Sequence, residues 1–178
     1  DRMLLVRANG PDTPWFEDDA TALKALEIGI LLPKVSSAAM LEDCARHLPG
    51  RDLWAMIETP GAILRIAEIC SSAARLPLKG IVIGTNDLAK DMGCRLGRSR
   101  RPVEAALTLS VCAARASGIA ALDGVFNDVQ DLDGFLAECR QGREMGFDGK
   151  TLIHPSQVDG ANTAFAPSEQ AAEDARDL

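Results

Sequence analysis

The chain has 178 residues, a length typical of one domain. Apolar residues make up 47% and aromatic residues only 4%, so we expect a folded core of alanine, leucine, isoleucine and valine rather than a disordered chain. The net charge of −7 argues against nucleic acid as a partner, and no apolar run reaches the ~18 residues of a transmembrane helix, which argues against a membrane protein.

The cysteines are odd in number and widely spaced, and no two of them form a C-x-x-C pair. We expect no secretory leader, because Asp1 and Arg2 lead directly into a strand-like run. This pattern predicts reduced, mostly buried thiols in a cytoplasmic protein. The five positions are Cys44, Cys70, Cys94, Cys112 and Cys139.

Short apolar runs in chain order predict six strands, at residues 3–7, 29–32, 53–57, 80–83, 119–122 and 147–153. Several runs are continuous rather than alternating, which is typical of strands buried on both faces of a parallel sheet. Apolar residues at helical spacing lie between the strands, at residues 41–48, 63–70, 103–114 and 132–139. This alternation predicts an α/β fold with helices outside a parallel sheet.

The ends of these helices carry recognisable signals. Ser36 or Ser37 and Asp131 are suitable N-cap residues. Gly118 and Gly146 stand where a left-handed residue would end a helix.

Polar residues close the apolar runs, and the most informative are Arg7, Glu58 and Asp87. The carboxyl ends of the strands in a parallel barrel share one face, which carries the chemistry. Two carboxylates at consecutive strand ends can share Mg²⁺, with water or substrate in its other positions. Arg7 is suited to balancing an anionic substrate or a developing enolate.

Simpler interpretations of these residues remain open. Glu58 and Asp87 also fit as helix N-caps or partners of the helix dipole, since a helix can follow each. His154 after the last strand is typical of a hydrogen-bonded structural histidine. Lys34 at another strand end fits an ion-pair partner better than a Schiff-base lysine.

Seven short motifs occur in a fixed order: V-R-A-N, L-P-K-V, I-E-T-P, G-T-N-D-L-A, A-A-R-A-S-G, L-D-G and G-K-T-L-I-H-P-S-Q, at residues 6–9, 32–35, 57–60, 84–89, 113–118, 122–124 and 149–157. With them the chain resembles the citrate lyase β-subunit-like proteins of the HpcH/HpaI aldolase superfamily. The resemblance implies a (β/α)₈ TIM barrel in which Glu58 and Asp87 bind Mg²⁺ and Arg7 contacts the substrate.

The resemblance also implies a reaction. It implies a Mg²⁺-dependent carbon–carbon lyase that cleaves a 3-hydroxy-acyl thioester of the citryl-, malyl- or citramalyl-CoA type by retro-Claisen or aldol chemistry. The carrier is coenzyme A or an acyl-carrier protein. The alternatives are a thioester hydrolase on the same scaffold and a non-catalytic subunit of a lyase complex. Because relatives assemble, we expect a homo-oligomer.

The chain departs from the family pattern in two ways. Ser36 stands where the family has an acid after L-P-K-V, which bears on the choice of substrate. The six βα units fall short of the eight in a closed barrel. We therefore expect residues 1–178 to form a single partial TIM-barrel domain that holds units 3–8, without counterparts of the first two units or of the family's C-terminal lid.

Arginines cluster between residues 91 and 102, where Arg95 precedes Arg98, Arg100 and Arg101. Guanidinium groups suit phosphates by charge and geometry, so the last three are candidates for contacts with the phosphates of coenzyme A. The alternative is a solvated, mobile loop.

Overall fold

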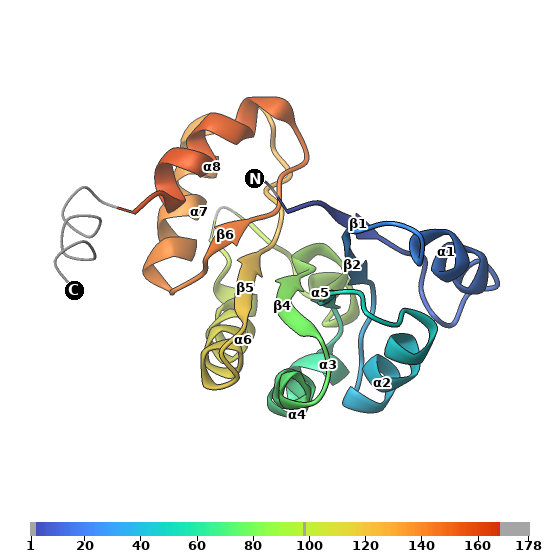
Figure 1. Cartoon of the computed structure of the whole chain (residues 1–178). Helices are drawn as coiled ribbons and strands as arrows, with labels where there is room; N and C mark the ends of the chain where they lie inside the picture. The colour runs from blue at the N-terminus through green and yellow to red at the C-terminus, as the bar shows by residue number, and fades with distance from the viewer. Residues whose placement is uncertain (1–2, 98, 168–178) are drawn as a thin grey trace, which may run out of the picture.

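Six parallel strands form one sheet in a computed structural model of the chain, which describes residues 3–97 and 99–167. Each strand pairs with the next along the chain, so the order is β1-β2-β3-β4-β5-β6. The sheet curls into a half-barrel, with α2, α4 and α6 on its outside (Figure 1). The strands are β1 (Leu5–Arg7), β2 (Gly29–Leu32), β3 (Leu53–Ile57), β4 (Leu78–Ile83), β5 (Ala120–Asp123) and β6 (Gly149–Lys150).

Helices separate the strands, as the alternation of patterns predicts. The α-helices are α1 (Phe16–Leu23), α2 (Ala38–His47), α3 (Pro60–Leu64), α4 (Ile66–Ser71), α5 (Thr85–Asp91), α6 (Glu104–Ala116), α7 (Leu132–Glu144) and α8 (Val158–Phe165). Short 3₁₀ turns complete the chain: η1 (Ser72–Ala74), η2 (Arg101–Val103) and η3 (Pro155–Gln157). The α/β class and the curled, TIM-like sheet are therefore confirmed, whereas the assignment to units 3–8 stays a prediction.

Two of the expected elements have different bounds in the structure. The helical pattern at 63–70 divides at Arg65, whose φ of −115° and ψ of 14° are not helical. The expected strand at 147–153 is shorter in the structure, where β6 spans two residues and the N–H and hydroxyl of Thr151 both donate to the carbonyl oxygen of Asp123. No specific range was expected for α1, α5 or α8.

The helix-end signals are confirmed. Ser37 accepts a hydrogen bond from the N–H of Met40, and Asp131 accepts one from the N–H of Gly134. Gly118 and Gly146 adopt φ values of 65° and 97°, in the left-handed region that glycine tolerates.

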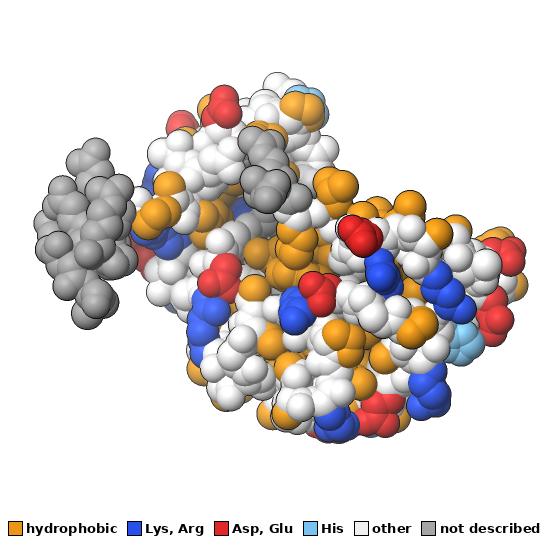
Figure 2. All heavy atoms as spheres, viewed as in Figure 1, with side chains coloured by type: hydrophobic (Ala, Val, Ile, Leu, Met, Phe, Trp, Pro, Cys, Tyr) orange, Lys and Arg blue, Asp and Glu red, His pale blue; other side chains and the backbone are white. Residues whose placement is uncertain are grey.

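Two apolar layers lie on either side of the sheet. Ile30, Ile57 and Ile81 face the helices and are completely buried in the main core. Leu31, Trp54 and Val82 form a second cluster on the other face. Hydrophobic side chains gather in the hollow that the curled sheet encloses (Figure 2).

Three thiols lie in the core, at Cys44, Cys70 and Cys139, and all five cysteines are free. Burial raises the pKa of Cys44 to about 11 and that of Cys70 to about 12, so these thiols stay protonated. Within the residues that the structure describes, no helix is both long and apolar enough to cross a membrane.

Gly80 on β4 lets the indole of Trp54 lie flat on the sheet, because a Cβ there would be 2.3 Å from the indole Cζ3. We predict that Gly80→Ala lowers the free energy of unfolding by about 1–3 kcal/mol, the usual range for overpacking, as measured by urea denaturation. Gly61→Ala is the control, since its nearest contact would be 3.8 Å away. Equal stability of Gly80→Ala and the wild type would contradict this packing.

Candidate metal and substrate site

The end of β3 carries Glu58, and the end of β4 carries Gly84, in directly adjacent positions. The two strands pair in register up to Ile57 and Ile83, so the next residues lie side by side. A Cβ on Gly84 would be 2.5 Å from the Cβ of Glu58 and 2.8 Å from its Oε2. Gly84 therefore provides the space that the Glu58 carboxylate occupies.

The Glu58 carboxylate is nearly buried, with 5% of the residue exposed. Its Oε1 accepts a hydrogen bond of 2.7 Å from the backbone N–H of Lys34. Lys34 has a φ of 52°, a left-handed conformation that is strained for a residue other than glycine. The strained turn after β2 thus directs a backbone donor at one carboxylate oxygen and leaves Oε2 for a ligand.

Charges gather around Glu58 from neighbouring strand ends. Burial raises the pKa of the Glu58 carboxyl, and the hydrogen bond from Lys34 opposes that shift. The charge of Asp87 also raises this pKa, whereas the charges of Lys34 and Arg7 lower it. Asp87 and Arg7, the other two predicted site residues, are therefore both close enough to Glu58 for their charges to act on its carboxyl.

Asp87 is half-buried in the first turn of α5. The N-cap of α5 is Gly84, and Thr59 caps α3 by accepting a hydrogen bond from the N–H of Ala62. The helix-cap interpretation therefore fails for both Glu58 and Asp87. Asp87 still benefits from the helix dipole, which favours an acid in the first turn.

Arg7 ends β1 with an exposed side chain. Within the described residues it forms no ion pair with a carboxylate. Lys34 is likewise exposed, so its amine is not desolvated as a Schiff-base lysine would be. The edge thus presents two cationic side chains beside two carboxylates.

The donor set fits a hard divalent cation. No group of three or more histidine, cysteine, aspartate or glutamate side chains that could hold a metal occurs in the described part of the chain. Glu58 and Asp87 would therefore supply two of the oxygen ligands, and water and substrate would supply the others, an arrangement that Mg²⁺ commonly adopts.

The arginine segment requires a correction. Arg100 is only 3% exposed, and its Nη1 lies 2.6 Å from Oδ1 of the buried Asp123. Its guanidinium is committed to the protein interior and is not available to a coenzyme A phosphate. Arg101 is exposed at the start of η2, and its phosphate contact stays a prediction. Arg98 lies outside the described residues.

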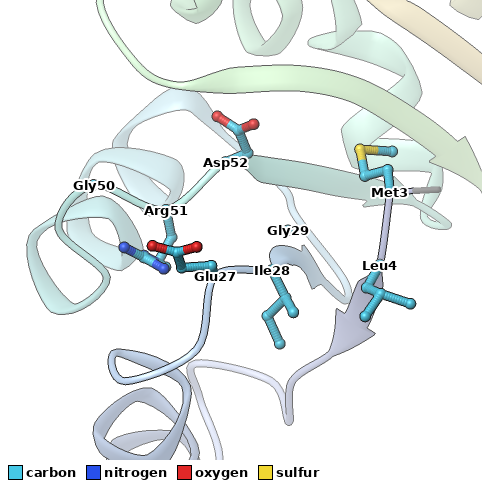
Figure 3. Close-up of a pocket in the computed structure, with 8 residues that line it drawn as sticks. All are labelled: Met3, Leu4, Glu27, Ile28, Gly29, Gly50, Arg51 and Asp52. Carbon is cyan, nitrogen blue, oxygen red and sulfur yellow. The ribbon is translucent and has the colours of Figure 1, made fainter. Parts of the chain in front are cut away.

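His154 caps η3, because its Nδ1 accepts a hydrogen bond of 3.2 Å from the N–H of Ser156. This confirms the structural interpretation of that histidine. The pocket drawn in Figure 3 lies at the opposite ends of the strands, where Leu4, Gly29 and Asp52 precede or open β1, β2 and β3. A second pocket, of about 770 Å³, lies beside Lys34 between α1 and α2, next to the candidate site.

Sequence reasoning missed two features of the site. The left-handed turn at Lys34 carries no glycine or asparagine to signal it. The side-chain amides of Asn86 and Asn127 exchange hydrogen bonds of 2.9 and 2.7 Å, and thereby tie α5 to the segment after β5. Their separation of 41 residues makes such a pair invisible to local patterns.

Glu58→Gln tests the cost of burying this charge. The folded-state pKa of Glu58 is raised above 4.5, so the folded state binds its proton more tightly and loses stability as pH rises through that window. We predict that Glu58→Gln raises the unfolding temperature at pH 7 in EDTA, and that the gain shrinks as pH falls toward 4.5.

Glu68→Gln is the matched control, because the exposed Glu68 also accepts one backbone hydrogen bond, from Ala38. It should show no gain at pH 7. A Glu58→Gln protein less stable than the wild type at pH 7 would show that the charged form is favoured.

Comparison with known proteins places the chain in a family. A family model described as HpcH/HpaI aldolase/citrate lyase matches residues 2–155. A (3S)-malyl-CoA thioesterase of Cereibacter sphaeroides is 51% identical over 168 residues, which cover 94% of this chain and 58% of that relative. A citrate lyase subunit beta of Leuconostoc mesenteroides subsp. cremoris is 32% identical over 187 residues, with 98% of this chain and 61% of the relative covered.

A solved structure shows the same arrangement of elements. It is a citrate lyase beta subunit from M. tuberculosis complexed with oxaloacetate and magnesium, 31% identical to this chain. Its TM-score is 0.81, and the match covers 92% of this chain and 73% of that one. The chain spans about three fifths of the length of the two curated relatives. It belongs to the HpcH/HpaI aldolase/citrate lyase family.

Proposed function

We propose that this chain carries the metal- and substrate-binding edge of a Mg²⁺-dependent enzyme that acts on a 3-hydroxy-acyl-CoA thioester. The observation that carries the proposal is the buried carboxylate of Glu58 at the strand ends, which accepts the backbone N–H of Lys34 and is acted on by the charges of Asp87 and Arg7. A bound Mg²⁺ would act there as a Lewis acid that polarises a substrate carbonyl.

The protein's own groups have separate tasks in this proposal. Glu58 and Asp87 supply the charge that holds the cation. Arg7 neutralises the carboxylate of a hydroxy-diacid substrate or the negative oxygen that develops on the thioester carbonyl. Thioester hydrolysis and carbon–carbon cleavage both place negative charge on the oxygen of the thioester carbonyl. Either reaction therefore needs a positive group such as Arg7 near that oxygen.

Thioester hydrolysis is our first candidate reaction, and the 51% identity with a (3S)-malyl-CoA thioesterase supports it. In this reaction water adds to the acyl carbon and the carbon–sulfur bond breaks, which releases a hydroxy acid and free coenzyme A. Carbon–carbon cleavage is the second candidate, supported by the 32% identity with a citrate lyase subunit beta. It would yield a 2-oxo acid and a shorter acyl thioester. Assembly as a homo-oligomer stays a prediction.

Product analysis of the protein with malyl-CoA and Mg²⁺ distinguishes these reactions. We expect a free thiol in equal amount to a four-carbon hydroxy acid, with no 2-oxo acid detected by hydrazone formation. A 2-oxo acid without free thiol would establish the lyase instead. If neither product forms, the proposal is overturned and a non-catalytic subunit is favoured.

Arg7→Lys should lower turnover more than about tenfold, a loss of ~1.4 kcal/mol in transition-state stabilisation. A guanidinium makes two parallel hydrogen bonds to a carboxylate, whereas an ammonium is a point charge. Arg46→Lys is the matched control, because Arg46 is exposed on α2 and, within the part of the chain that the structure describes, pairs with Asp43 alone. Steady-state turnover of Arg7→Lys equal to that of the control would show that Arg7 has a structural role.

A further inference from the structure

A cluster of four charged side chains, of which Glu138 alone is partly exposed, lies between the end of the sheet and α7. Arg100 contacts Asp123 at 2.6 Å, and Lys150 contacts Asp123 at 3.0 Å and Glu138 at 2.6 Å. The side chains of Asp123 and Lys150 are completely buried. Two cations balance two anions, so the cluster is electrically neutral.

Stability alone is a weak reason for such a cluster. Removing charges from water costs several kcal/mol per ion, and well-packed apolar side chains would hold two elements together equally well. The structure even makes room for these groups, because a Cβ on Gly142 of α7 would lie 2.8 Å from Oδ2 of Asp123. The backbone groups that this cluster binds therefore indicate its role.

The cluster forms hydrogen bonds with both the N–H and the carbonyl oxygen of Gly124. Oδ1 of Asp123 accepts a hydrogen bond of 2.7 Å from the N–H of Gly124. Nζ of Lys150 donates one of 2.5 Å to the carbonyl oxygen of Gly124. The backbone turn that leaves β5 is thus fixed by buried charged groups on both sides.

Gly124 in turn packs against the start of α5. A Cβ on Gly124 would lie 2.5 Å from Oγ1 of Thr85, which is the first residue of that helix. Three residues after Gly124, Asn127 exchanges two side-chain hydrogen bonds with Asn86. Asp87 is the next residue after Asn86. The turn after β5 therefore packs against the first turn of α5, which carries the Asp87 carboxylate.

We propose that Arg100, Asp123, Lys150 and Glu138 are positioning residues that hold the Asp87 carboxylate at its distance from Glu58 by clamping the Gly124 turn against α5. This inference rests on the proposed function, because it takes Asp87 as a metal ligand. If it is right, substitution of these side chains, which touch no substrate, changes the affinity of the protein for Mg²⁺.

Lys150→Met tests the proposal, because it keeps the length of the side chain and removes the donor to Gly124. We expect the dissociation constant for Mg²⁺ to rise at least about tenfold, measured by isothermal titration calorimetry with MgCl₂ alone. The matched control is Arg115→Met, which removes an ion pair with Asp148 at the opposite end of the same strands. The control should lower the unfolding midpoint and leave Mg²⁺ affinity within about twofold of the wild type.

Asn127→Ala provides a second test that leaves no buried charge unpaired. Asn127 is exposed, so the variant should fold even if Lys150→Met does not. It should weaken Mg²⁺ binding about threefold or more, because α5 loses its amide partner. Mg²⁺ binding as tight as that of the wild type in Asn127→Ala, or in a folded Lys150→Met protein, would overturn the clamp.

Asp87→Ala separates this failure from failure of the proposed function. If Asp87→Ala loses Mg²⁺ binding while both clamp variants retain it, the site stands and only the positioning role is wrong. If Asp87→Ala binds Mg²⁺ like the wild type, the metal site itself is wrong and the clamp is overturned with it.

Discussion

The buried carboxylate of Glu58 is the feature around which this edge of the sheet is organised. A carboxylate removed from water is unfavourable unless other groups replace its hydration, and among the described residues the backbone N–H of Lys34 replaces part of it. Burial raises the pKa of this carboxyl, as expected where hydration is only partly replaced. A cation bound between Glu58 and Asp87 would supply what is missing, so the apparent defect of the folded protein becomes a reason for metal affinity.

The parallel topology makes this arrangement possible. Because each strand pairs with the next along the chain, the turns that follow β1, β2, β3 and β4 meet at one edge. Each turn contributes one element: a guanidinium at Arg7, a backbone donor at Lys34, and carboxylates at Glu58 and Asp87. Gly84 keeps the space between the last two turns open. The outer helices bury the other side of the sheet and so hold these turns in place.

The candidate site residues could be selected from the sequence because strand ends are marked by polar residues after apolar runs. The same reasoning placed Arg100 in solvent, although it lies in the interior beside Asp123. A local pattern cannot distinguish an exposed arginine from one whose partners are 23 and 38 residues away. The burial of Arg100 depends on elements that lie later in the sequence. The left-handed turn at Lys34 was missed for a similar reason, since tertiary contacts impose it on a residue that does not favour it.

The position of the bound metal is the most direct test of this account. A crystal of the protein grown with Mn²⁺ in place of Mg²⁺ would reveal the ion by its anomalous scattering. A metal site at this edge predicts a single strong peak between the carboxylates of Glu58 and Asp87, within the ~2.0–2.6 Å expected for metal–oxygen bonds. A well-diffracting crystal with no peak there, or with its strongest peak elsewhere, would contradict it.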